Sequence, residues 1–338
     1  MPAAALTLPF EVLTRVFSLT TFNEQHMTVA LISKAWHAWA LAQRGGKASF
    51  SPKRGQLLPA HAVKHAWNSG TLLRKPSQQR VVLACAAGDG AVMLVVWLRS
   101  RHCECDASAC TAAAAAGDLH VLRWLRAQRP PCPWDEGTCA AAAGEGRLEV
   151  LQWLRAQSPP CPWGVGTWAG AARRGSRAML TWLRTQQDPP CPWDETACTA
   201  AARAGQLSAL RWLRALSPPC PWEERTCEAA AQGGRLGVLQ WLRAQDPPCP
   251  WGERTCAAAA QDGHLGVLQW LRAQHPPCPW EERTCAAAAQ GGHLGVLQWL
   301  RAQHPPCPWD GCVVNYARQR GHNQLVRWAL EHGPQSWV

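Results

Sequence analysis

The 338-residue sequence is poor in three residue types and lacks long apolar runs. Lysine stops after Lys75, Tyr316 is the only tyrosine and Ile32 is the only isoleucine, a depletion that a GC-rich coding sequence explains. No apolar run approaches the roughly 20 residues that a membrane-spanning helix needs. The N-terminus has no basic stretch before an apolar one, as a secretory signal would. We therefore expect an intracellular protein, cytoplasmic or nuclear, with no membrane partner.

Catalytic motifs are also missing. The sequence has no glycine-rich phosphate loop, no GxSxG nucleophile elbow and no HExxH metal motif. The acidic residues that recur are adjacent pairs such as Glu223-Glu224, which are typical of exposed turns, and His264 and His293 occupy a repeated turn. We therefore expect no enzyme, no catalytic residue and no cofactor.

What the sequence does contain is a repeat. Cys-Pro-Trp occurs seven times at intervals of 29 or 30 residues, from Cys132 to Cys307. Trp-Leu keeps the same interval from Trp124 to Trp299, with one further copy 27 residues earlier at Trp97. A fixed period of this size indicates stacked supersecondary units that bury their apolar faces against their neighbours. The sequence therefore predicts a solenoid that displays a surface.

One unit, residues 226–254, shows the expected local structure. Thr226 is placed to cap a short helix that Gly233-Gly234 ends, and Leu236, Leu239 and Leu242 follow at helical spacing. Prolines 247 and 248 then stop the second helix, because proline has no amide donor. Each unit is predicted to be a helix, a tight turn, a second helix and an extended return. Alanine in first helices opposite large residues in second helices favours a curved stack.

Seventeen cysteines and two rows of tryptophans recur with the repeat. In most units six residues separate two cysteines, which is too many for a zinc knuckle, whose ligand pairs lie about two to four residues apart. Where the second cysteine is due after Cys161 the chain has Trp168, which a ligand role would not permit. We expect buried packing cysteines, not disulfides or metal ligands, and we expect the tryptophan of Cys-Pro-Trp to fold under the return segment.

The units resemble ankyrin repeats, which share a threonine-initiated helix and a Gly-His-Leu turn. Residues 263–268 and 292–297 match that turn and second helix. The resemblance covers about residues 81–338, although these units have 29 residues where ankyrin units have about 33. It implies a curved α-solenoid of ankyrin-like repeats over residues 79–338, about nine units with degenerate first and last members, in an all-α protein that binds other proteins.

Residues 5–44 differ in style from the array and resemble an F-box. The residues that match its pattern in order are Leu8-Pro9, Glu11, Leu13, Val16-Phe17, Leu19, Ile32-Ser33-Lys34 and Trp36. The resemblance implies that a Skp-type adaptor of a cullin-RING ubiquitin ligase is contacted by Leu8, Pro9, Val12, Leu13, Val16 and Phe17. The alternative is a small amphipathic helical cap on the array.

Residues 45–78 form a basic linker. The first 80 residues hold ten Lys or Arg and only Glu11 and Glu24, so they contribute most of the net charge of +11. Such a stretch attracts polyanions, although it is also typical of a solvated linker. It could act with a row of arginines on the repeats, namely Arg126, Arg155, Arg184, Arg214, Arg243, Arg272 and Arg301.

Two functions of different kinds follow. In the first, the chain is the substrate receptor of a Skp-cullin-F-box ligase, a monomer whose repeats bind an unknown protein substrate, and nucleic acid is an unlikely partner. In the second, it is a free scaffold for a protein or a polyanion. The partner-binding residues are expected where units differ, at Asp135, Glu136, Arg173, Arg174, Asp194, Glu195, Arg203, Glu223, Glu224, Arg225, Glu253, Arg254, Glu281, Glu282 and Arg283.

Overall fold

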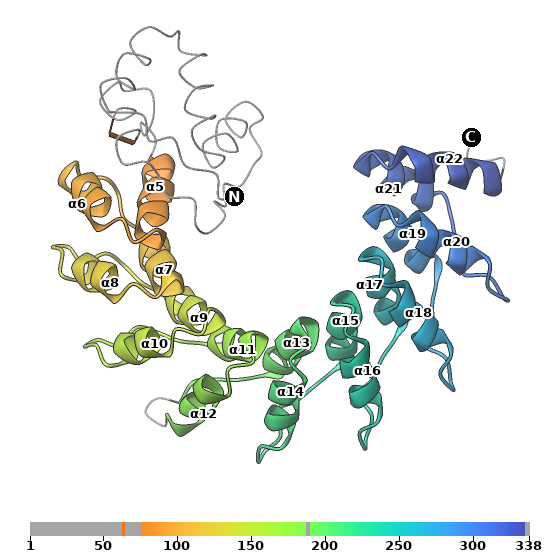
Figure 1. The fold of residues 1–338 in the computed structure, drawn as a ribbon, viewed down its shortest axis with the longest axis horizontal. Coiled ribbons are helices and arrows are strands. Elements are labelled where there is room, and N and C mark those ends of the chain that lie inside the picture. Colours follow the sequence, from red (N-terminus) through yellow and green to blue (C-terminus); the bar gives the residue numbers. More distant parts are fainter. Residues whose placement is uncertain (1–62, 65–75, 187–189, 335–338) are drawn as a thin grey trace, which may run out of the picture. The chain divides into compact units, whose positions relative to one another are not determined.

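A computed structural model describes residues 63–64, 76–186 and 190–334. All regular structure in these ranges is helical, eighteen helices and no strand (Figure 1). This confirms an all-α helical-repeat solenoid. The predicted F-box-like module, with its six adaptor contacts, lies outside the described residues. In the described part no helix is both long and apolar enough to cross a bilayer.

The described chain forms two compact bodies, the first up to Ala142 with Glu149–Pro162 and the second Ala143–Leu148 with the chain from Trp163 onward. The first body contains α5 (Pro76–Gly88), α6 (Val92–Ser100), α7 (Ala107–Ala116), α8 (Leu119–Arg126) and parts of α9 (Glu136–Gly144) and α10 (Leu148–Arg155). The second contains α11 (Val165–Arg174), α12 (Arg177–Thr185), α13 (Glu195–Ala204), α14 (Leu207–Arg214), α15 (Glu224–Gln232), α16 (Leu236–Arg243), α17 (Glu253–Gln261), α18 (Leu265–Arg272), α19 (Glu282–Gly291), α20 (Leu294–Arg301), α21 (Cys312–Arg320) and α22 (Asn323–His332).

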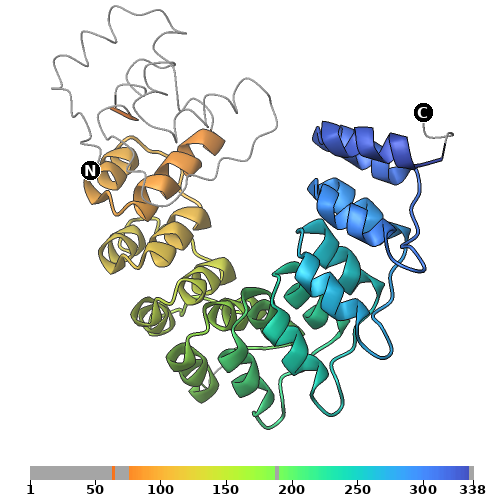
Figure 2. The same ribbon diagram turned by 45° about the vertical axis from the view of Figure 1, so that its right-hand side comes forward.

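Each unit is the helix, turn, helix and extended return that the sequence predicts. In the second body the odd-numbered first helices pack against one another in order, from α11 to α21, and the even-numbered second helices form a second layer (Figures 1 and 2). We call the exposed side of the odd-numbered layer of this body the first-helix face.

The first helices start three residues earlier than predicted. Thr226 is not the N-cap: it is the third residue of α15, and its Oγ1 accepts a hydrogen bond of 3.3 Å from the backbone N–H of Glu223. Thr255 and Thr284 accept the same bond from Gly252 and Glu281. The threonine is fully buried at all three positions. It satisfies an amide at the helix start that would otherwise have no partner.

The core follows the expected division between small and large residues. Ala259 and Ala260 of α17 and Leu268 and Leu271 of α18 are completely buried, and the equivalent residues of neighbouring units repeat this pattern. Small side chains let adjacent first helices approach closely, while each buried leucine contributes about 1.5–3 kcal/mol. The same packing of buried alanines and leucines therefore stabilises successive units.

The cysteines are mostly packing residues, as predicted, with one exception. Fourteen thiols are buried and free, and the thiol of Cys-Pro-Trp approaches a backbone carbonyl of the preceding first-helix start, as Cys249 does with Glu223 (3.5 Å). Cys105 and Cys132, however, form a disulfide between successive units, which corrects the expectation that none forms. Trp168 stands where other units have cysteine, and its indole N–H donates to the Cys191 carbonyl (3.1 Å), the carbonyl that a thiol approaches elsewhere.

Thiol labelling of the native protein should be confined to one site. Cys312 is the only exposed free cysteine of the seventeen, all of which are described. Burial raises the pKa of Cys85 and Cys110 to about 12, and a thiol that stays protonated and inaccessible does not react. We expect Ellman's reagent at pH 8 to label one thiol of the folded protein and the rest only after denaturation. Rapid labelling that persists in Cys312→Ser would contradict the burial of the fourteen other free cysteines.

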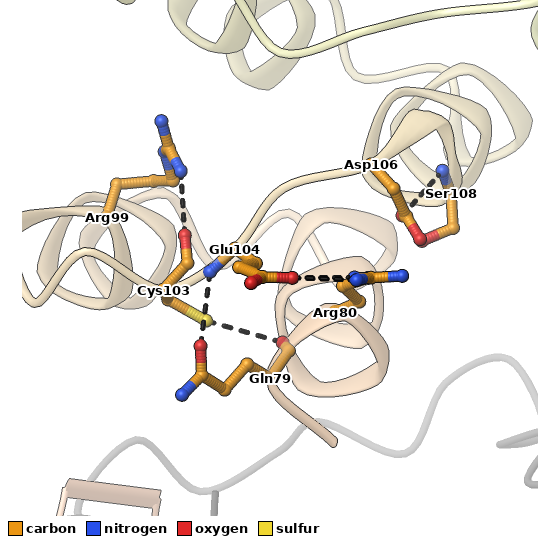
Figure 3. Close-up of polar contacts among 7 residues, drawn as sticks. All are labelled: Gln79, Arg80, Arg99, Cys103, Glu104, Asp106 and Ser108. Carbon is orange, nitrogen blue, oxygen red and sulfur yellow. Dashed lines mark hydrogen bonds and ion pairs between the residues drawn. The ribbon is translucent and has the colours of Figure 1, made fainter. Parts of the chain in front are cut away.

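The degenerate first unit, which lacks Cys-Pro-Trp, still forms the thiol–carbonyl and arginine–carbonyl contacts of the other units (Figure 3). Cys103 takes the place of the Cys-Pro-Trp cysteine: its thiol donates to the Gln79 carbonyl (3.4 Å), and Arg99 donates to the Cys103 carbonyl (2.7 Å). Arg80 of α5 forms an ion pair of 2.7 Å with Glu104 (Figure 3). These contacts hold the return segment on α5 with the geometry of the other units.

Thr167 breaks the threonine pattern. Its hydroxyl is completely buried and has no hydrogen-bond partner among the described residues, unlike that of Thr255. Leaving a buried polar group unpaired costs about 1–3 kcal/mol. We therefore expect Thr167→Val to leave stability unchanged or raise it by up to about 1 kcal/mol, and Thr255→Val to lower it by about 1 kcal/mol, both measured by urea unfolding. Equal losses in the two variants would contradict this distinction.

Candidate ligand groove

The arginines of the predicted row make structural contacts within the repeats. Arg243 Nη1 donates to the Cys249 carbonyl at 2.6 Å, and its guanidinium carbon lies 4.0 Å from the centre of the Trp251 ring. Trp251 in turn meets Trp270 of the next unit edge to face, at 6.0 Å between ring centroids. Arg126, Arg214, Arg272 and Arg301 repeat both contacts, with ring distances of 3.8–4.5 Å. These Arg–Trp rungs join one unit to the next.

The tryptophans and one arginine of these contacts differ from what the sequence predicts. The Cys-Pro-Trp tryptophans are half-buried, apart from the buried Trp163, because one ring face is covered by arginine instead of by the return segment. Arg184 is an exception in the row, since it donates to the Ser217 carbonyl of the next unit (3.0 Å) and lies 5.8 Å from Trp193. A polyanion would have to displace these contacts to reach the arginines.

Removing one rung should lower stability without changing polyanion binding. Arg272→Ala removes a cation–π contact and a charge-assisted hydrogen bond, together about 1–2 kcal/mol. Arg272→Lys should recover less than half, because lysine lacks the planar donor group. The measurements are the urea midpoint and retention on heparin. Lower heparin retention at unchanged stability would mean that the arginine row binds polyanions after all.

A groove of about 210 Å³ lies on the first-helix face over α15, α17, α19 and α21. Ala257, Ala258, Ala286 and Ala287 line the groove, and each is about 8% exposed. Polar and charged residues complete the lining: Glu228, Gln232, Arg254, Gln261, Arg283, Gln290 and Tyr316.

The groove repeats unit by unit. Arg254 and Arg283 are each the second residue of a first helix, and Gln232, Gln261 and Gln290 are equivalent residues near the ends of three such helices. Both arginines are exposed. Within the described ranges neither forms an ion pair or a side-chain hydrogen bond, in contrast to the arginines of the rungs. They are the two arginines of the groove lining, and both are available to a ligand.

Most of the other predicted contact residues start or end helices. Asp135 and Asp194 accept hydrogen bonds from backbone amides at the starts of α9 and α13. Glu136, Glu195, Glu224, Glu253 and Glu282 are first helical residues, and Glu223 and Glu281 precede α15 and α19. Such acids favour the positive end of a helix dipole. Exposed arginines complete the set, with Arg225 in the first turn of α15 and Arg173, Arg174 and Arg203 near first-helix ends; Arg173 donates to the Gly144 carbonyl (3.2 Å).

Two of these acids lie together. A hydrogen bond between the exposed side chains of Glu253 and Glu281, and their mutual repulsion, raise the pKa of the Glu281 carboxyl. Of the predicted contact set, the structure thus brings Arg254 and Arg283 into one groove and places Glu253 beside Glu281. Sequence reasoning missed Gln232, Gln261, Gln290 and Tyr316. The equal spacing of the glutamines was the signal that could have found them.

The first body has a separate hollow of about 540 Å³ between two turns, lined by residues 88–90 and 116–120. Its Asp118 carboxylate already accepts hydrogen bonds from the backbone amides of His120 and Val121. Among the described residues, no group of three or more His, Cys, Asp or Glu side chains is placed to hold a metal ion. The groove on the first-helix face is therefore the better candidate.

Comparison with known proteins gives the fold class only. No family model and no curated protein matches the chain. Two solved structures share its helical-repeat architecture: the pentatricopeptide repeat protein PPR10 in complex with an 18-nt psaJ RNA element, and a cysteine-to-serine variant of PPR10 with the same RNA. Each is 11% identical with a TM-score of 0.42, and the match covers 96% of this chain and 53% of the other. The chain thus spans about half the length of those proteins.

These structures correct one expectation. Both are complexes with RNA, so the expectation that nucleic acid is an unlikely partner is corrected to one that leaves RNA open. RNA is therefore included among the ligands to be tested. Beyond that, the chain is similar to these proteins in its stacked helical repeats.

Proposed function

We propose that the chain is a non-enzymatic, intracellular binding scaffold whose ligand site is the groove on the first-helix face. The observation that carries this proposal is the different use of the two sets of arginines. Those of the rungs are committed to tryptophan rings and carbonyls, whereas Arg254 and Arg283 line a groove without an ion pair among the described residues. Solenoids bind partners on an exposed surface that their stacked repeats hold in place.

Filling the groove tests this proposal. Gln261 is exposed at the groove, and Gln269 is exposed on α18 in the other layer, so Gln261→Trp and Gln269→Trp add the same bulk to different faces. Each variant would be used for affinity capture from cells, with bound proteins and nucleic acids quantified. We expect partners of the wild type to be retained by Gln269→Trp and reduced at least tenfold by Gln261→Trp. Equal retention by both variants would place the ligand site elsewhere.

We further propose that residues 5–44 dock a Skp-type adaptor, which would make the scaffold the substrate receptor of a cullin-RING ubiquitin ligase. The support is the ordered F-box-like pattern from Leu8 to Trp36. The absence of lysine after Lys75 agrees with a position beside a ubiquitin-transfer machine, where acceptor lysines are modified, although a GC-rich coding sequence explains the same absence.

Purified adaptor tests this second proposal directly. Wild-type protein should capture the adaptor, and a Leu8→Ala/Pro9→Ala variant should not, while Leu57→Ala in the linker should behave as wild type. If the wild type does not capture the adaptor, the proposed ligase role is wrong and only the scaffold role is left. The groove variants are expected to keep adaptor binding, since they alter a different part of the chain.

A further inference from the structure

The spacing of the groove arginines suggests a ligand with its own period. Arg254 and Arg283 occupy equivalent positions on α17 and α19, which pack against each other as successive first helices. Packed helices lie about 8–10 Å apart, so equivalent side chains of adjacent units recur at about that distance. An extended peptide rises about 3.1–3.4 Å per residue, so three residues span about 9–10 Å.

We propose that the groove binds an extended acidic peptide whose carboxylates are three residues apart, one for Arg254 and one for Arg283. This inference rests on the proposed function, because it assigns a ligand class to the same groove. Arginine pairs with carboxylates through two parallel hydrogen bonds, which fixes position as well as charge. One carboxylate per unit would hold such a peptide in register with the repeat.

The rest of the lining fits a peptide backbone. The small alanine side chains of the lining leave room for a chain to approach the helices, and the side-chain amides of Gln232, Gln261 and Gln290 offer both donors and acceptors for its peptide groups. Glu228 is the one acid in the groove, and it lies on α15. The same helix carries the exposed Arg225 at the position equivalent to Arg254 and Arg283, so charge alone gives the ligand no direction.

The acids around the arginines favour separated charges over a continuous run. Glu253 and Glu282 directly precede Arg254 and Arg283, and Glu281 precedes Glu282. A polymer with a negative charge on every monomer would meet these carboxylates between the arginines, and like charges side by side cost binding energy. A peptide with two neutral residues between its acids avoids them.

The experiment uses the full chain and labelled peptides in fluorescence anisotropy. The probe has three Glu-Pro-Thr triplets, because proline keeps the chain extended at about 9.3 Å per triplet. The comparison peptide has the same composition with its three glutamates adjacent, and a labelled nine-nucleotide single-stranded RNA is the third probe. We expect the spaced peptide to bind at least tenfold more tightly than either of the others.

Variants assign the contacts. Arg254→Ala and Arg283→Ala should each weaken binding of the spaced peptide about tenfold, and Arg283→Lys should recover part of that loss. Arg211→Ala removes the same charge from the exposed side of α14, in the other layer, and should have no effect. Circular dichroism of each variant confirms that it is folded.

Several results would overturn the inference: equal binding of both peptides, tighter binding of the RNA, no binding of the spaced peptide, or equal losses in Arg211→Ala and Arg283→Ala. The proposed function fails separately. If Gln261→Trp removes captured partners or bound RNA while the spaced peptide does not bind, the groove is a ligand site and only the ligand class is wrong. If Gln261→Trp also changes nothing, both proposals are wrong.

Discussion

Replacing Leu268 by alanine is expected to lower the free energy of unfolding by about 3 kcal/mol. Leu268 is completely buried in α18, whose side chains cover the small residues of the first helices. The substitution removes buried methyl groups and leaves a cavity, because the helices on either side are held in place by their own neighbours. The array offers little room for collapse at this site.

Urea unfolding followed by circular dichroism measures this loss. Gln269→Ala is the matched control, since Gln269 is the next residue of α18 and is exposed, and it should change stability by less than about 0.5 kcal/mol. A loss below about 1 kcal/mol for Leu268→Ala would mean that the interior between the two helix layers is not tightly packed. The midpoint of Leu297→Ala, the equivalent change one unit later, should fall similarly.

The same substitution at two glycines of one unit should have opposite effects. Gly263 has a φ of +78°, and a Cβ there would lie 2.6 Å from Nδ1 of His293, which fills the space below the turn. The left-handed conformation costs about 1–2 kcal/mol for alanine, and the imidazole must also shift. We expect Gly263→Ala to lower stability by about 2 kcal/mol.

Gly266, three residues later, is the matched control. It lies in the first turn of α18, and a Cβ there would meet nothing within 4 Å. Alanine restricts the unfolded chain and favours helix, so Gly266→Ala should raise stability by up to about 1 kcal/mol. Both changes are measured by the thermal and urea midpoints. Two losses of equal size would contradict the different backbone conformations of the two glycines.

Periodicity made the fold predictable. A 29-residue interval, helix-spaced leucines and paired glycines are local features, and they predicted the paired helices, the turns and the extended returns in the described units. The helix starts were misplaced because Thr226 satisfies the N-cap amide from inside the helix, and sequence alone does not distinguish this arrangement from a threonine N-cap.

The site was harder to predict, because it depends on which side chains meet across units. Arg243 and Arg254 both recur with the repeat, yet Arg243 is fixed by Trp251 and a carbonyl while Arg254 lines a groove. The disulfide between Cys105 and Cys132 was missed for the same reason, since it joins cysteines of successive units with different local sequences. Contacts across an interface follow from three-dimensional packing, which periodicity specifies only in outline.

The account depends on 29-residue units that share one interface, and deleting one whole unit tests this most directly. Removing residues 252–280 joins Trp251 to Glu281 in the same register, so we expect a folded protein with unchanged helicity per residue and a cooperative urea transition at a slightly lower midpoint. Removing residues 266–280, about half a unit, should abolish cooperative unfolding. Loss of structure in the whole-unit deletion, or equal behaviour of the two deletions, would contradict the stacked-repeat architecture and the groove that depends on it.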